Sequence, residues 1–411
     1  MSTPRSRRLV LALLASACVA PLGCSSEPGA ATVDKPAATD SDTAPRASAA
    51  ADDDPDQPFV LGSGLEPFEP PPLEELDKLA WREGRVLDSM EALRAEQQSQ
   101  GPPELTAEQA LALKNDSPEN NEKILAALGR VAPADGAGVD YNARIVRHVG
   151  GDLNSTNPLF VSSVTDSEFA DLTSIALLGF DRDLTYFAPK EIVKSWQTTD
   201  DAMIDRFVLR DDLTWSDGKP VTAHDVEFSF RLIMSDHPKL IIPSVRTGVD
   251  QLRWIKAYDD HTLAIFHKAP LATNQPNMIF PILPKHIYEK SVYEDPSLRA
   301  SDYHTRQEAK PVVAGAFEFA SRKRNEEFVV RRRESYFKHN GAEVRPRPYF
   351  SEVRVKVIED VNTALLALKA GDIDQMELRP EHWESQTTGD DFYRRNTKVT
   401  QSEWTEFHVE W

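Results

Sequence analysis

The 411-residue chain has only two cysteines, Cys18 and Cys24, and both lie within its first two dozen residues. The remainder therefore has no disulfide framework, no thiol nucleophile and no cysteine-based zinc site. Its ten histidines lack the short helical spacing of a metal site. The sequence also contains no nucleophile elbow, phosphate-binding loop or dinucleotide fingerprint. We therefore expect no catalytic residues, no metal and no cofactor, and predict that the protein is not an enzyme.

Lysine and arginine, 47 together, are outnumbered by 66 acidic residues, and the formal net charge is −19. Between residues 27 and 140, acidic residues outnumber basic ones 24 to 9. A basic stripe is absent, which argues against nucleic acid as a partner. No run of eighteen or more apolar residues follows the first two dozen positions, so no membrane-spanning helix is expected in the mature protein. The composition, 40% hydrophobic and 27% charged, is that of a soluble globular protein.

Residues 1–24 have the features of an export signal, because three arginines precede an apolar run that begins at Leu9. The segment ends in Pro-Leu-Gly-Cys, which resembles a bacterial lipobox, whose cysteine is lipidated. Cys24 is therefore the predicted lipidation site, although Pro21 stands where leucine is usual. Two alternatives remain open: lipidation at Cys18, or an ordinary cleaved signal peptide.

Two segments separate this signal from the globular core. Residues 25–72 are rich in Ala, Asp, Pro, Ser and Thr, and we predict a disordered acidic linker. Residues 73–135 are predicted to form a helical extension, with apolar residues at helical spacing over 73–93. Thr106 and Ser117 are its predicted helix N-caps. The extension either docks on the core or contacts a protein partner.

The segment 206–234 follows local rules most closely. A half-buried strand is predicted at Phe207, and a tight turn is predicted at Gly218. Thr222 and Asp225 have the spacing of a capping box, with aspartate in the place of glutamate, at the start of an amphipathic helix. These rules predict a strand, a turn and a capped helix, but they indicate no function.

The same segment resembles the signature of family 5 extracellular solute-binding proteins, the oligopeptide, dipeptide and nickel receptors of ABC importers. Further landmarks keep the order of the family from residue 142 to the end. The resemblance is carried by Trp215-x-Asp217-Gly218-x-Pro220, Asp225-Val226-x-Phe228-Ser229, Pro284-Lys285-His286-Ile287-Tyr288 and Gly371-Asp372-Ile373-Asp374.

This resemblance implies an α/β fold of the type II periplasmic-binding-protein class, which has two lobes. Residues 141–354 would form lobe I, and residues 355–411 would begin an incomplete lobe II. Because the family continues for another one to two hundred residues, we expect the chain to be truncated at its C-terminal end.

Ligand contacts are likewise implied by the resemblance. In the family, the loop after the first strand of the core lies at the mouth of the cleft. Carried over by position, the ligand-binding candidates are Asp152, Leu153 and Asn154, for which turn chemistry alone is the alternative. Trp404 and Phe407 are further candidates, since the matching strand of the family carries aromatic residues near the ligand. Trp404 can equally belong to the core.

The function implied is that of an extracytoplasmic lipoprotein that binds peptides for import, with ABC permease subunits as partners. It would lie in the periplasmic space, anchored to the membrane by its lipid. The lack of aspartate directly after Cys24 favours the outer membrane in a Gram-negative cell. One alternative is the same fold with a non-peptide ligand, such as a nickel chelate, haem or an oligosaccharide. The other is a non-transporting surface lipoprotein whose extension engages a protein.

Overall fold

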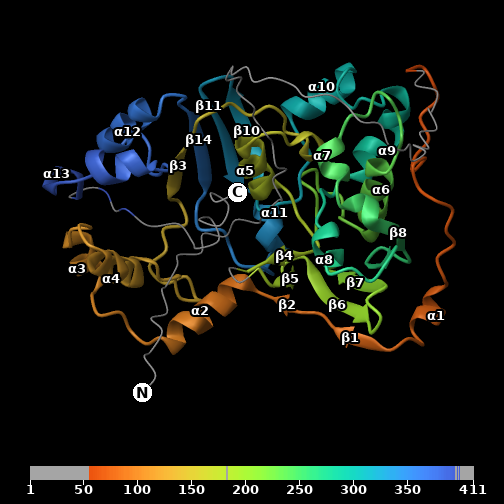
Figure 1. The fold of residues 1–411 in the computed structure, drawn as a ribbon, viewed down its shortest axis with the longest axis horizontal. Helices are drawn as coiled ribbons and strands as arrows, with labels where there is room; N and C mark the ends of the chain where they lie inside the picture. The colour runs from red at the N-terminus through yellow and green to blue at the C-terminus, as the bar shows by residue number, and fades with distance from the viewer. Residues whose placement is uncertain (1–54, 182–183, 394–395, 397, 399–411) are drawn as a thin grey trace, which may run out of the picture.

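The computed structural model describes residues 55–181, 184–393, 396 and 398. The α/β class expected from the sequence is confirmed by two main sheets and the helices packed against them (Figure 1). None of the helices in these ranges has the length and hydrophobicity needed to cross a bilayer.

The larger sheet has five antiparallel strands in the order β1-β6-β7-β9-β8. The strand predicted at Phe207 is confirmed, and its side chains alternate between buried and half-buried positions. The β8–β9 turn is closed by the Asp259 carboxylate, which accepts from the N–H groups of His261 and Thr262 at 2.7 Å each. The strands are β1 (Trp81–Glu83), β6 (Val193–Thr199), β7 (Ile204–Leu209), β8 (Leu252–Ala257) and β9 (Thr262–His267).

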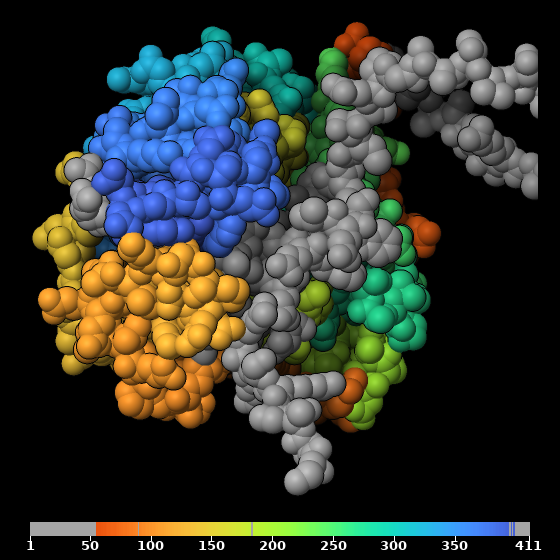
Figure 2. Space-filling view, turned by 60° about the vertical axis from the view of Figure 1, so that its left-hand side comes forward, coloured from red at the N-terminus to blue at the C-terminus, as the bar shows by residue number. Residues whose placement is uncertain are grey.

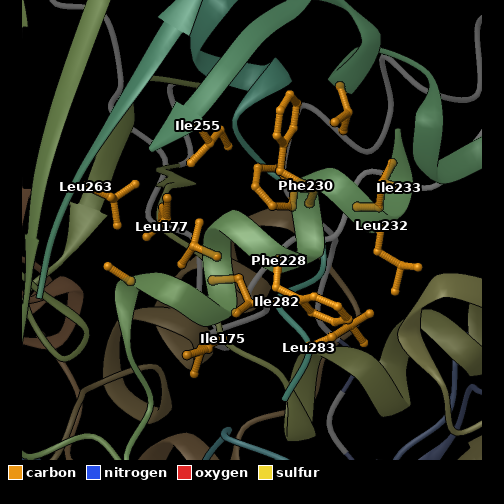
Figure 3. Close-up of a cluster of buried hydrophobic side chains, with 14 of the residues drawn as sticks. Ile175, Leu177, Phe228, Phe230, Leu232, Ile233, Ile255, Leu263, Ile282 and Leu283 are labelled. Carbon is orange, nitrogen blue, oxygen red and sulfur yellow. The ribbon is translucent and has the colours of Figure 1, made fainter. Parts of the chain in front are cut away.

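Helix α6 (Ala223–Ile233) packs against this sheet and forms the centre of the main hydrophobic core. Figure 3 shows Phe228, Phe230 and Leu232 of α6 among side chains that include Ile255 of β8. The predicted start of the helix is confirmed: the Asp225 carboxylate accepts from the N–H of Thr222 at 2.8 Å. Helix α9 (Lys285–Glu294) packs against α6 from the other side.

The second sheet has the order β10-β11-β14-β3, and only its β14–β3 pair is parallel. Helix α5 (Val164–Thr173) packs on it through Phe169, which lies edge-on to Phe319 and Phe328. The lobe boundary expected after residue 354 falls inside β14, and α12 (Val361–Ala370) follows that strand. The strands are β3 (Arg144–Val149), β10 (Phe317–Lys323), β11 (Glu327–Arg332) and β14 (Glu352–Val357).

Residues 55–72 are ordered, so the prediction of a disordered linker over 25–72 is wrong for this part; residues 25–54 lie outside the described ranges. Phe59 is buried in the main core, and the N–H of Gly64 donates to the carbonyl of Met234 at 2.9 Å. The segment runs along the side of the larger sheet to α1 (Leu73–Leu76) (Figure 1). The prediction failed because the stretch 25–72 is polar on average, although a few of its residues, such as Phe59, are apolar and pack into the core.

The continuous helix predicted over 73–93 is also wrong, because short strands interrupt it. Strand β1 pairs with the edge of β6, and β2 (Val86–Leu87) pairs with β5 (Tyr186–Pro189) in a small sheet completed by β4 (Gly179–Phe180). Between them, the N–H of Gly84 donates to the carbonyl of Trp196 at 2.7 Å. A Cβ at Gly84 would lie 2.3 Å from the Trp196 ring. Pairing with an open sheet edge therefore overrides the helical spacing.

The later helices of the extension are confirmed, with Thr106 capping α3 (Ala107–Ala112) and Ser117 capping α4 (Pro118–Leu128). They lie against the C-terminal helices, as Figure 2 shows in orange and blue. There Lys114 pairs with Asp390, and the Asn115 amide donates to the carbonyl of Lys398.

The remaining elements connect these layers. They are α2 (Ser89–Ser99), η1 (Pro158–Phe160), α7 (Pro243–Arg246), η2 (Val249–Gln251), α8 (Asn274–Asn277), α10 (Asp302–Ala309), α11 (Glu334–Phe337), β12 (Lys338–His339), β13 (Ala342–Glu343), the π-helical turn η3 (His382–Gln386) and α13 (Asp390–Tyr393).

Candidate functional site

The parallel pair β3–β14 determines where a ligand would approach the second sheet. In α/β proteins, ligands bind in the crevice outside the carboxyl ends of parallel strands. Residues 150–157, here named the candidate loop, leave β3 at that end. The β10–β11 turn reaches the same edge, because Glu327 of β11 pairs with Lys356 of β14, which in turn pairs with His148 near the end of β3. The candidate loop therefore lies at the edge of the sheet where this rule would place a ligand.

Asp152 begins the loop, and its carboxylate is occupied by groups of the protein. One oxygen accepts from the N–H of Leu153 at 2.8 Å, and the other accepts from Arg322 at 2.8 Å and from the N–H of Asn325 at 3.0 Å. The side chain is 15% exposed. Burial opposes its ionisation, but these donors outweigh burial and hold the pKa of Asp152 below its usual range. The carboxylate thus remains charged and joins the loop to the β10–β11 hairpin.

Leu153 and Asn154 face in opposite directions. Leu153 is completely buried in the core of the second sheet, and its carbonyl accepts from Arg322. Asn154 is exposed, and its N–H donates to the Asp166 carboxylate at 2.7 Å. Its side-chain amide lies 3.3 Å from Ser162 Oγ and 3.3 Å from Asp166. The structure therefore brings the three predicted residues together at one edge, with different chemistry at each.

Two further carboxylates hold this loop and were not foreseen from the sequence. Asp166, in the first turn of α5, accepts from the N–H groups of Asn154 and Ser162. Glu308, in α10, accepts from the N–H of Thr156 at 2.6 Å and from Ser155 Oγ at 3.1 Å. The Ser-x-x-Asp spacing before α5 is a capping signal that could have indicated Asp166. Nothing local indicates Glu308, about 150 positions away.

The segment that carries the family resemblance, residues 206–234, belongs to the scaffold and does not form the edge from which the candidate loop leaves β3. Trp215, Phe228 and Ser229 are buried. The Asp225 carboxylate accepts from the N–H of Lys285 at 2.8 Å, and the Ser229 hydroxyl accepts from the N–H of Leu283 at 2.8 Å. Burial raises the pKa of Asp225 in spite of its hydrogen bonds. These residues therefore fasten α6 to the start of α9.

A serine, a histidine and an aspartate are aligned behind the candidate loop. His304 lies 3.0 Å from Asp295 and 2.9 Å from Ser291 Oγ, and its side chain is buried. The Ser291 hydroxyl also donates to the carbonyl of Ile287 within its own helix, at 3.0 Å. This serine is thus committed to holding α9 and α10 together and does not face a substrate. Among the described residues, no group of three or more histidine, cysteine or acidic side chains could hold a metal ion.

Two small cavities lie beside these residues, with volumes of about 10 and 20 Å³. They share Thr156, Tyr288 and Pro311 as lining residues. Each has room for roughly one water molecule, which is far too little for a peptide or sugar. Neither cavity can therefore hold a ligand of that size.

The other predicted site residues, Trp404, Phe407 and the lipidation site Cys24, lie outside the described residues, as does Cys18. They remain predictions.

Comparison with known proteins gives a consistent set of relatives. A family model described as bacterial extracellular solute-binding proteins, family 5 Middle, matches residues 190–410. Protein XP55 of Streptomyces lividans is 27% identical over 204 residues, which are 50% of this chain and 34% of that protein. The periplasmic oligopeptide-binding protein OppA of Escherichia coli K12 is 32% identical over 171 residues, or 36% of this chain and 30% of OppA. The chain spans about a third of the length of these curated relatives.

Among solved structures, the oligopeptide-binding protein AppA of Bacillus subtilis in complex with a nonapeptide is 22% identical, with a TM-score of 0.48. The match covers 57% of this chain and 44% of AppA.

Proposed function

The chain belongs to family 5 of the bacterial extracellular solute-binding proteins, and on this premise we propose that it binds peptides outside the cytoplasm for import by an ABC transporter. Proteins of this family are transport receptors and not enzymes, in agreement with the expectation from the sequence. The observation that carries the proposal is the family match over residues 190–410, which includes the scaffold around Asp225. The relatives named as oligopeptide-binding proteins favour peptide over other solutes.

The proposed contact surface is the candidate loop. Asp152 would offer backbone groups and exposed Asn154 would offer its side-chain amide, whereas Leu153, which is completely buried, would anchor the loop in the core. Backbone hydrogen bonds suit a peptide of variable sequence, because every peptide main chain carries the same donors and acceptors. Trp404 and Phe407 would add aromatic contacts.

The decisive experiment is a ligand screen of the protein purified from a bacterial periplasm. Native mass spectrometry would identify what is retained, and a thermal-shift assay would compare short peptides, nickel chelates, haem and oligosaccharides. Retention of peptides, with stabilisation by peptides alone, is the expected result. Stabilisation by a chelate or sugar, with none by peptides, would contradict the peptide assignment.

We further propose that Cys24 carries a lipid and that the protein lies in the periplasm, anchored to the cell envelope, with ABC permease subunits as its partners. Cells supplied with tritiated palmitate should label the wild-type chain and C18A, but not C24A. Labelling of C24A with loss of labelling in C18A would place the anchor at Cys18, and labelling of neither wild type nor variants would exclude the lipid.

A further inference from the structure

We infer that Asp166 and Glu308 are positioning residues, which hold the candidate loop in its ligand-ready shape and leave it to recognise uncharged amide groups of the ligand. This inference rests on the proposed function, because it assigns the part of the peptide that meets the loop. The two residues come from different helices, α5 and α10, and touch consecutive residues of the same loop.

Asp166 is the more deeply placed of the two, at 1% exposure. One carboxylate oxygen accepts from the N–H of Asn154 at 2.7 Å and from that of Ser155 at 3.4 Å. The other accepts from both the N–H and the hydroxyl of Ser162, each at 3.0 Å. A single buried carboxylate thus draws the two ends of the segment 154–162 together. Hydrogen bonds to a charged acceptor are roughly twice as strong as neutral ones.

Glu308 secures the next stretch of the loop. Its carboxylate accepts from the N–H of Thr156 and from the hydroxyl of Ser155, and its own carbonyl accepts from the Thr156 hydroxyl at 2.8 Å. Both backbone and side chain of Glu308 therefore hold Thr156. Together with Asp152 and its partner Arg322, three carboxylates hold the loop from three directions.

Each of these carboxylates points toward the protein and already accepts several hydrogen bonds from it. The groups that face outward are of a different kind. Gly150, Gly151 and Asn154 are exposed, and a Cβ at either glycine would meet no atom within 4 Å. The Gly151 carbonyl accepts from the Thr165 hydroxyl at 2.9 Å, and the Asn154 amide nitrogen donates to Ser162 and Asp166 at 3.3 Å each. The exposed residues of the loop are nevertheless all uncharged, which suits the main-chain amides of a ligand and gives no advantage to a charged terminus.

A loop fixed in this way has little conformational entropy left to lose on binding. A loosened loop would have to be ordered on binding, and the backbone entropy lost in that step lowers the affinity. The positioning role therefore predicts a loss of affinity when the loop is loosened, even though neither carboxylate touches the ligand.

The test compares D166N and E308Q with D88N in the full chain. Asp88 is a matched control, because it is a buried aspartate whose carboxylate caps α2 through the N–H of Glu91. Each substitution keeps the shape of the side chain and replaces one oxygen by an amide nitrogen, which cannot accept from the loop. Hydrogen exchange of the native protein is measured at the backbone amides of residues 154–156 and 162.

We expect exchange to be at least tenfold faster at 154, 155 and 162 in D166N and at 156 in E308Q, with D88N like wild type at these amides. Unchanged exchange in both variants would overturn the positioning role. Unfolding midpoints measured in parallel separate loosening of the loop from loss of the whole fold.

The binding arm uses tetra-alanine with a free or an acetylated N-terminus as probes. D166N and E308Q should bind both probes about tenfold more weakly, mainly through faster release, and acetylation should not change the size of this effect. A loosened loop with unchanged affinity would refute the inference while leaving the proposed function intact. If wild type binds neither probe nor any peptide, the proposed function fails, and the exchange measurement alone decides the positioning role.

Discussion

Two buried aspartates at helix starts, Asp225 of α6 and Asp166 of α5, hold the chain in comparable ways but in different surroundings. Asp225 is 4% exposed and lies in the large apolar core, where it joins α6 to the start of α9. Asp166 is 1% exposed and holds a loop at the edge of the smaller sheet. The comparison shows that the residues identifying the family build its scaffold, whereas those shaping the candidate site are held by polar contacts elsewhere.

The largest effect on stability is predicted for the apolar core around α6. Phe230→Ala removes a fully buried ring from the core around α6 and should lower the free energy of unfolding by about 3–5 kcal/mol. Denaturant unfolding followed by circular dichroism measures the change. Val60→Ala, at a side chain that is 59% exposed, is the control and should stay within about 0.5 kcal/mol of wild type. A loss below about 1 kcal/mol for Phe230→Ala would show that the core does not close around α6.

The two aspartates can be compared directly by alanine substitution. Asp225→Ala leaves the N–H groups of Thr222 and Lys285 without their acceptor in a dry core, and should cost about 2–4 kcal/mol. Asp166→Ala should cost less, about 1–2 kcal/mol, because water can reach the exposed loop residue Asn154. Equal losses, or a greater loss for Asp166→Ala in the same unfolding assay, would remove the distinction between scaffold and site.

Glu191 is a third carboxylate, in surroundings that differ from those of both aspartates. Burial raises its pKa to about 7. Its pKa in the unfolded chain is lower, so the folded protein binds the extra proton between roughly pH 4.5 and 7. Stability from this group is therefore greatest below that range and declines as the pH rises through it. Glu191→Gln should remove the decline and be roughly 2 kcal/mol more stable than wild type at pH 8, with little difference near pH 4.5. Parallel pH profiles of unfolding for the two proteins would contradict this assignment.

The smallest effect is expected in the extension, away from both aspartates. Thr106→Ala removes the capping box of α3 and should cost about 1 kcal/mol. If the extension unfolds together with the core, the loss shifts the single global transition. A separate early transition, detected by hydrogen exchange in α3 and α4, would show that the extension is an independent unit.

The sequence was most informative where local rules and tertiary structure agree. The strand at Phe207 and the Asp225 cap both follow from spacing and turn chemistry. The linker and the extension were wrongly predicted where contacts distant in sequence decide the structure. Phe59 of the linker is held by the main core, and residues 81–83 of the extension form a strand because β6 has an open edge.

The candidate site was only partly predictable for the same reason. Resemblance placed Asp152, Leu153 and Asn154 at one edge, but Arg322 and Glu308 reach the loop across more than 150 positions, where no local pattern applies. The pairing of the Asp152 carboxylate with Arg322 could be recognised only from the three-dimensional structure.

The most direct test of peptide binding at the candidate loop is hydrogen exchange of the full chain with and without a saturating mixture of short peptides. Slower exchange at residues 150–154 on peptide addition, with the amides of α6 unchanged, is the predicted result. Protection confined to other parts of the chain, with the loop exchanging as before, would contradict the account.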